Sequence, residues 1–259
     1  MRAFISESGV EGYGTSIDNS ASRSRQFRAD DEWRKRWYVS RTGRAAALVV
    51  RHGVGGFVQE CYYRSLDHYY EWYFGVETGG LTSKEELDLC QEEWHEFSSV
   101  YYQHIFNVLK RLPVETRESV FLDYGCGNGR ALVAAASIGY RRIIGIEVSR
   151  LVDLARINVG RMRHRKAFTI ELKQCDATDF AVPSDVNIIY FYNPFRGATL
   201  EAVLKNIHNS YLNAKRKIFI VYFNNGHFDK VVSCCQWLTK RSQEEVYCKT
   251  SCAVYETSK

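Results

Sequence analysis

The stretch FLDYGCGNG, residues 121–129, decides the fold of this chain. It predicts a buried strand, a loop with glycines at alternate positions, and then a helix from Arg130 to Ile138. Glycine has no Cβ atom and adopts positive φ, so a ligand can approach the backbone of such a loop closely. The helix points its first free amides into the same loop. The stretch therefore predicts a site for a small charged cofactor.

The spacing of the glycines separates two classes of cofactor site. A dinucleotide-binding loop has the pattern G-x-G-x-x-G, which from Gly125 requires a glycine at position 130. That position is Arg130, and the third glycine is Gly129, so the pattern becomes D-x-G-x-G-x-G from Asp123. The spacing disfavours a dinucleotide. For the loop taken alone, an ordinary glycine-rich turn is the alternative.

This pattern resembles motif I of the class I S-adenosylmethionine-dependent methyltransferases. In that family the loop surrounds the amino-acid end of the cofactor, which has no pyrophosphate. The resemblance implies that S-adenosyl-L-methionine is the cofactor of this chain. The loop residues that it assigns to cofactor binding are Asp123, Tyr124, Gly125, Gly127 and Gly129.

Three further apolar strands end in polar residues, in the order that the resembling family requires. They end at Glu147, at Asp176-Ala177 and at Asn193. Ligands of open α/β sheets bind outside the carboxyl ends of the strands, so we expect these ends to converge. Glu147 follows the loop by about 20 residues, the spacing at which an acid meets a ribose hydroxyl. The resemblance implies that Asp176 receives the adenine amino group and that the backbone amide of Ala177 meets a ring nitrogen.

Asn193 and Phe195 are the residues predicted to act on the methyl acceptor. The side-chain oxygen of Asn193 can accept a hydrogen bond from an amine, and Phe195 can flank the acceptor group. Asn193 is also counted among the cofactor-binding residues. Asn193-Pro194-Phe195 partly resembles the Asn-Pro-Pro-aromatic motif of amino-directed DNA methyltransferases but lacks the second proline. A strand-ending turn is the alternative explanation of Asn193-Pro194.

From Asp67 to about Phe223 the chain resembles a group of class I methyltransferases related to the non-SET histone lysine methyltransferases. The resemblance is carried by residues 74–80, 123–130, 142–149 and 192–195. It implies N-methylation of a protein lysine or a small-molecule amine, so a protein or small-molecule acceptor is the expected partner. Methylation of a nucleic acid and a non-catalytic S-adenosylmethionine-binding module are the alternatives.

The whole pattern predicts an α/β fold, a doubly wound, mostly parallel seven-stranded sheet with an antiparallel last strand and an N-terminal helical segment. The last two strands are predicted as a hairpin that turns at Gln243-Glu244-Glu245. Residues 1–44 are predicted as a flexible basic segment, residues 45–112 as a helical, aromatic-rich extension or lid, and residues 113–259 as the S-adenosylmethionine-binding domain.

Two patterns stand out within the predicted extension. Seven aromatic residues lie between Tyr62 and Phe74, which favours either a lid over the site or a cluster that anchors this segment to the sheet domain. Apolar residues recur at three- and four-residue steps from Leu87 to Val108. They predict one long amphipathic helix, which begins at a capping box of Thr82 and Glu85 and ends near Leu112-Pro113.

The composition and charge of the chain bear on its partners, its metal content and its location. The chain has 259 residues and a formal net charge of +5, with a basic run between Tyr140 and Lys166. That run suits a nucleic acid or an acidic protein, but a solvated helix face is the alternative, and no aromatic residues are interleaved with its arginines. The eight cysteines lack zinc-like spacing, which predicts reduced thiols and no metal. With no apolar span or leader pattern, a cytoplasmic location away from membranes is expected.

Overall fold

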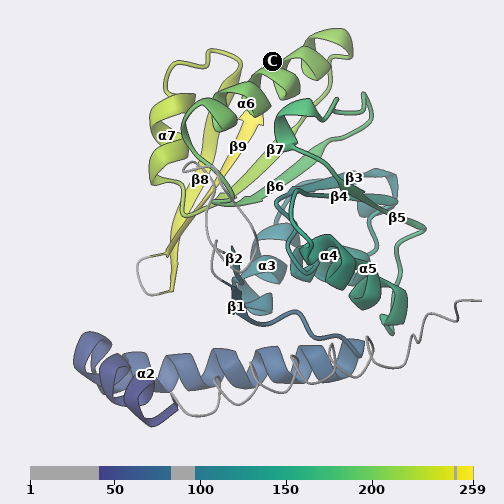
Figure 1. Ribbon diagram of the computed structural model, residues 1–259. Coiled ribbons are helices and arrows are strands. Elements are labelled where there is room, and N and C mark those ends of the chain that lie inside the picture. Colours follow the sequence, from purple (N-terminus) through teal and green to yellow (C-terminus); the bar gives the residue numbers. More distant parts are fainter. Residues whose placement is uncertain (1–40, 83–96, 248–249, 259) are drawn as a thin grey trace, which may run out of the picture. The chain divides into compact units, whose positions relative to one another are not determined.

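The computed structural model describes residues 41–82, 97–247 and 250–258 (Figure 1). Contacts between Cα atoms divide the chain into two compact units, Met1–Phe57 and Val58–Lys259. The second unit contains the sheet and the candidate site. Helix α2, Arg41–Phe74, consists of two helices that meet at Gly53, whose φ of 70° and ψ of 177° are not helical. In the part of the chain that is described, no helix is both long enough and apolar enough to cross a membrane.

Seven strands form one sheet in the order β5-β4-β3-β6-β7-β9-β8. The strands are β3 (Val120–Tyr124), β4 (Arg142–Glu147), β5 (Thr169–Gln174), β6 (Ile188–Tyr192), β7 (Phe219–Phe223), β8 (Leu238–Tyr247) and β9 (Thr250–Thr257). The first five pair in parallel, and β9 is antiparallel to both of its neighbours. Numbered within the sheet, the order is 3-2-1-4-5-7-6 with an antiparallel strand 7. This is the Rossmann-like fold of class I methyltransferases, so the predicted fold class is confirmed.

Helices cover both faces of the sheet (Figure 1). They are α3 (Tyr102–Leu109), α4 (Arg130–Ile138), α5 (Leu151–Arg161), α6 (Gly197–Asn213) and α7 (Gly226–Val232), with short 3-10 helices η1 (Thr116–Glu118) and η2 (Ala177–Asp179). Successive side chains of a strand point to opposite faces, so Phe121 packs in the core under α3 and α4. Its neighbour Leu122 packs in the core under α6 and α7. Both faces of the central strands are therefore buried, as expected of a parallel sheet.

The single long helix predicted through Val108 is wrong. Phe97–Ser98 (β2) pairs with Leu81–Thr82 (β1) in a small antiparallel sheet, and α3 begins only at Tyr102. The Oδ1 atom of Asp67 accepts a hydrogen bond from the Tyr102 amide at 2.9 Å, which satisfies a first-turn donor of α3 and fixes where the helix begins. Thr82 of the predicted capping box is the last residue of β1, and Glu85 with the rest of that prediction falls on residues 83–96, outside the described residues.

The predicted turn of the C-terminal hairpin is also misplaced. Gln243, Glu244 and Glu245 lie within β8, where they pair with residues 251–253 of β9. Strand β8 is the outer strand of the sheet, and polar side chains are common on such an edge because they discourage pairing with other chains. The polar run therefore continues a strand, and the connection lies beyond Tyr247, at two residues outside the described part.

Candidate cofactor site

The candidate site is built where three parallel strands end side by side. Strand β3 pairs with β4 so that Tyr124 lies opposite Ile146, and with β6 so that Tyr124 lies opposite Phe191. This register places the residues that follow the three strands at one edge of the sheet. Asp123, Glu147 and Asn193 are therefore brought together there, as ligand sites of open α/β sheets require.

The glycine loop is held against the end of β4 by its backbone. The amides of Gly125 and Cys126 both donate to the Ile146 carbonyl at 2.9 Å. Gly125 has a φ of +72°, and a Cβ atom added to it would lie 2.6 Å from the Cβ of Pro194. Glycine is needed here both for the backbone conformation and for the close approach of the loop that follows β6.

Glu147 joins the end of β4 to the glycine loop. Its side chain is only 8% exposed. The Oε2 atom accepts from the amide of Gly127 at 2.8 Å, and Oε1 accepts from the amide and hydroxyl of Ser149 at 2.9 and 2.7 Å. A carboxylate offers about four acceptor positions, so these three hydrogen bonds leave it able to accept from a ligand hydroxyl. The carboxylate is therefore oriented before any ligand arrives.

Asp123 is a second buried acid at this edge, and its pKa is shifted. Its side chain is 3% exposed on β3. Burial raises the pKa of its carboxyl well above the usual value, and the nearby charge of Glu147 raises it further. A cation beside such a group stabilises its ionised form. The pair therefore suits a ligand that carries positive charge close to hydroxyl groups.

Asp176 and Ala177 follow β5 at the neighbouring strand end. The Cys175 amide donates to the Glu147 carbonyl at 3.1 Å, which ties this turn to the end of β4. Asp176 caps η2, because its Oδ1 accepts from the amide and the hydroxyl of Thr178, both at 2.8 Å. The structure thus places Asp176-Ala177 beside Glu147, with one carboxylate oxygen engaged in a local turn.

Two of the predicted site residues have side chains in the core. The Tyr124 ring is fully buried and stacks on Phe191 with 5.1 Å between the ring centroids. Phe195 is 4% exposed, and its ring meets the Tyr124 ring edge-on at 6.3 Å. This burial does not fit a Phe195 side chain that flanks a methyl acceptor. Phe195 belongs instead to the buried cluster that includes Tyr124 and Phe191.

Two buried amide oxygens at this edge lack a donor. The Oδ1 atoms of Asn128, in the glycine loop, and of Asn193, after β6, have no hydrogen-bond partner in the described part of the chain. Buried polar atoms are nearly always paired in folded proteins, and leaving one unpaired costs about 1–3 kcal/mol. Both oxygens lie at the carboxyl ends of the strands, the edge at which open α/β sheets bind ligands. Asn128 was not among the predicted site residues.

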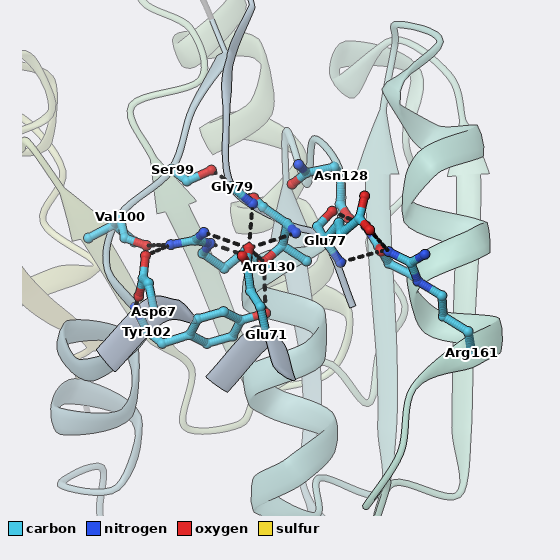
Figure 2. A network of polar contacts seen from close by, with 12 residues as sticks. Asp67, Glu71, Glu77, Gly79, Ser99, Val100, Tyr102, Asn128, Arg130 and Arg161 are labelled. Carbon is cyan, nitrogen blue, oxygen red and sulfur yellow. Dashed lines mark hydrogen bonds and ion pairs between the residues drawn. The ribbon is translucent and has the colours of Figure 1, made fainter. Parts of the chain in front are cut away.

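A buried arginine fixes the start of α4 (Figure 2). Arg130 donates to the carboxylates of Asp67 and Glu71, to the Thr78 hydroxyl at 3.2 Å, and to the Val100 carbonyl at 3.1 Å. Its guanidinium also lies 4.8 Å from the centre of the Tyr102 ring. This network was missed by sequence reasoning, although an arginine at the head of the otherwise apolar helix Arg130–Ile138 was a signal for it.

The segment of residues 75–80, here called the strap, is held from two sides, by Glu71 of α2 and by Asn158 of α5. Oε1 of Glu71 accepts from the amides of Thr78 and Gly79 at 2.8 and 2.6 Å. On the other side, Nδ2 of Asn158 donates to the carbonyls of Glu77 and Asn128, at 2.8 and 2.9 Å (Figure 2). The strap is therefore held by polar contacts, and Asn158 ties it to the predicted cofactor loop.

The aromatic segment that precedes the strap has two faces. Tyr70 and Phe74 pack with Tyr102 and Phe106 of α3, which is the arrangement expected of an anchoring cluster. Tyr62, Tyr69 and Trp72 are exposed instead. Part of the aromatic segment therefore anchors the helix, and part of it faces outward.

Cys126 lies in the glycine loop but is not placed as a nucleophile. Burial raises the pKa of its thiol well above the usual value, and the charges of Asp123 and Glu147 act in the same direction. A thiol that resists ionisation is a poor nucleophile.

Within residues 41–82, 97–247 and 250–258, no group of three or more His, Cys, Asp or Glu side chains is arranged to hold a metal ion.

No family model matches the sequence, and no curated protein matches it. Among solved structures, the chain is similar to an RNA methyltransferase from Salinibacter ruber in complex with S-adenosyl-L-homocysteine, with 18% identity, 61% of this chain and 93% of that chain covered, and a TM-score of 0.47. A SAM dependent methyltransferase from Aquifex aeolicus shares 14% identity over 60% of this chain and 89% of that one, with a TM-score of 0.47. Precorrin 8W decarboxylase from Methanobacterium thermoautotrophicum shares 15% identity over 62% and 92%, with a TM-score of 0.45. At these values none of the three indicates an activity for this chain.

Proposed function

We propose that this protein is an S-adenosylmethionine-dependent methyltransferase whose cofactor binds at the carboxyl ends of β3, β4 and β6. The observation that carries the proposal is the hydrogen bond between the Gly127 amide and Glu147, which joins a three-glycine loop to an oriented carboxylate in a sheet of class I order. Such a carboxylate suits the two hydroxyls of a ribose.

The start of α4 supports this cofactor over a dinucleotide. A dinucleotide loop needs its third glycine at position 130 for close packing of helix and strand and leaves the helix N-terminus for a pyrophosphate. Here that position is Arg130, whose buried side chain is engaged with Asp67 and Glu71. This arginine and its two carboxylate partners stand where a dinucleotide loop requires a glycine.

The residues at the site fit the parts of S-adenosylmethionine. Glu147 would hold the ribose, and Asp176 with the Ala177 amide would hold the adenine. Asp123 and the unpaired Oδ1 of Asn128 would face the ammonium group of the amino-acid end. When bound, the cofactor supplies a methyl group that is already activated by its sulfonium. The protein then needs to align the acceptor and exclude water, and it needs no strong acid or base for the transfer itself.

We further propose that the acceptor is an amine, of a protein lysine or of a small molecule. Asn193 is the residue that supports this, because its buried Oδ1 has no donor within the described residues and sits after β6 at the same edge as the glycine loop. An amide oxygen in that position accepts an N–H of the acceptor and orients the nitrogen. The amine must also lose a proton before it attacks, and that proton passes to water or a neighbouring group.

A transfer assay with methyl-labelled S-adenosylmethionine tests the proposal. The protein is incubated with cell extract, which is then separated into protein, nucleic acid and small molecules, and Glu147→Gln serves as the negative control. Label in protein or in small-molecule amines supports the proposal. Label in nucleic acid alone corrects the acceptor class. Cofactor binding without label in any fraction indicates a non-catalytic binding module.

A further inference from the structure

The basic residues after α5 share a surface with exposed aromatic rings that come from a distant part of the sequence. Arg161, Arg163, Arg165 and Lys166 are all exposed. No Phe, Tyr or Trp lies among them in the sequence, and His164 is the one ring between Arg163 and Arg165. The C-terminal end of α2, about 90 residues earlier in the sequence, lies against these basic residues in the fold. It carries outward-facing aromatic rings.

The aromatic rings form a continuous exposed row. Trp72 is 68% exposed, Tyr69 is 51% exposed and Tyr73 is 36% exposed. Tyr73 stacks on His164 with 4.2 Å between ring centroids and 12° between the planes. Tyr69 stacks on Tyr73 at 6.0 Å and lies 6.2 Å from Trp72. The row Trp72-Tyr69-Tyr73-His164 therefore runs into the middle of the basic residues.

The row and the basic residues are fixed to one another by the backbone. The Arg163 amide donates to the Phe74 carbonyl at 2.8 Å, and its guanidinium donates to the Trp72 carbonyl. A Cβ atom added to Gly75 would lie 2.8 Å from Nε of Arg163, so the two segments are in close contact. A ligand that binds here meets a preformed platform and does not have to order it.

We propose that this surface binds single-stranded nucleic acid. Unpaired bases stack on exposed aromatic faces and phosphates bind to the adjacent cations, and each stacked base contributes about 1–3 kcal/mol. An arginine side chain has five N–H donors, so the contacts of Arg163 and Arg165 with backbone carbonyls leave donors for phosphates. In a duplex the base faces are already covered by neighbouring base pairs, so they cannot stack on the aromatic rings.

The charges around the row favour a polyanion. Asp67 and Glu71 lie on α2 beside the row, and both pair with the buried side chain of Arg130. Glu77 lies 4.0 Å from Arg161 at the rim. An acidic protein would also pair with the arginines, but it has no physical need for three exposed rings. The combination of rings and cations selects the nucleic acid.

This inference goes beyond the proposed methyl transfer and does not depend on it. The surface is connected to the candidate site through the strap, since Asn158 bonds both to Glu77 and to Asn128 of the glycine loop. Binding is therefore measured without cofactor or turnover, and cofactor binding is measured separately on the same variants.

The test is fluorescence anisotropy with a labelled oligouridine of about 16 nucleotides and with a duplex of the same length, using the full chain. The wild type is expected to bind the single strand more tightly than the duplex. Trp72→Ala is expected to weaken the affinity about 5- to 150-fold, the range that corresponds to one lost stacking contact. The double variant Arg165→Gln/Lys166→Gln is expected to lower the slope of log affinity against log salt by about 1.4.

Matched variants on α6 provide the controls. Leu212→Ala removes an exposed apolar side chain and Lys205→Gln removes an exposed charge, and both are expected to leave the affinity unchanged. Circular dichroism and S-adenosylmethionine titration confirm that each variant is folded. No binding of the single strand, equal affinity for the duplex, an affinity that Trp72→Ala does not change, or tighter binding of an acidic peptide such as residues 85–96 overturns the proposal.

Discussion

The amide of Gly127 donates a 2.8 Å hydrogen bond to Oε2 of Glu147. This contact joins the loop after β3 to the end of β4, and it orients a carboxylate at the place where the glycines leave the backbone open. The two strand ends therefore act as one binding unit.

Asp123→Asn is expected to change how stability depends on pH. Burial and the charge of Glu147 raise the pKa of Asp123 in the folded state above its unfolded value near 4. The stability linked to its proton is therefore complete below about pH 4 and is lost as the pH rises through the folded pKa. Asparagine resembles the protonated acid and avoids this loss, so the variant gains stability over the wild type as the pH rises. Urea unfolding from pH 5 to pH 8 measures the difference, and a difference that does not change with pH refutes the expectation.

Gly125→Ala is expected to lower the free energy of unfolding and to weaken cofactor binding. The substitution strains a residue with φ of +72° and drives its Cβ into Pro194, at a cost of about 1–3 kcal/mol for the backbone alone. Gly160→Ala is the matched control, because a Cβ there meets nothing within 4 Å and the residue lies in α5. That variant should be stabilised by about 0.5–1 kcal/mol. Equal effects of the two substitutions on urea unfolding would argue against the packing of Gly125 on Pro194.

Arg130→Met is expected to destabilise the second unit by about 3–5 kcal/mol, because it leaves the buried Asp67 carboxylate without its partner. Arg111→Met is the control. It breaks an exposed ion pair with Glu244, which contributes about 0–1 kcal/mol. Urea unfolding compares the two variants. A similar small loss in both would show that the Arg130 network does not hold the strap and helix α2 in place.

Asn193→Gly separates the side chain of Asn193 from its backbone. Glycine keeps the φ of 43° without strain but removes Oδ1, so folding and cofactor affinity should be retained while methyl transfer falls about 100-fold or more. Asn224→Gly is the control, since Asn224 has a φ of 61° and lies at the end of another strand, β7, where it is exposed. Labelled methyl transfer by the two variants is the measurement. Full activity of Asn193→Gly would remove Asn193 from the acceptor site.

The strands and the glycine loop could be predicted from the sequence because their signals are local. The loop and helix α4 follow from glycine spacing and from an apolar run that begins after Gly129, and the predicted helix Arg130–Ile138 is confirmed. The mostly parallel sheet with an antiparallel last strand followed from the alternation of strands and helices together with a known family pattern. These features depend on residues that are close in sequence.

What could not be predicted depends on partners that are far apart. Arg130 and Asp67 are 63 residues apart, and nothing near either residue identifies the other. The burial of Phe195 depends on its contacts with Tyr124, about 70 residues earlier, which the local sequence Asn193-Pro194-Phe195 does not specify. Phe97–Ser98 lies within the run from Leu87 to Val108, whose apolar residues have helical spacing. Its pairing with Leu81–Thr82 overrides that local pattern.

The most direct test of the central claim is calorimetric titration of S-adenosylmethionine into the wild type, Glu147→Gln and Glu201→Gln, with a nicotinamide dinucleotide titrated in parallel. We predict saturable binding of S-adenosylmethionine by the wild type. Glu147→Gln loses a charged acceptor and should bind about 10- to 150-fold more weakly, whereas the exposed Glu201 on α6 should have no effect. Tighter binding of the dinucleotide, or an affinity for S-adenosylmethionine that does not depend on Glu147, would contradict the account.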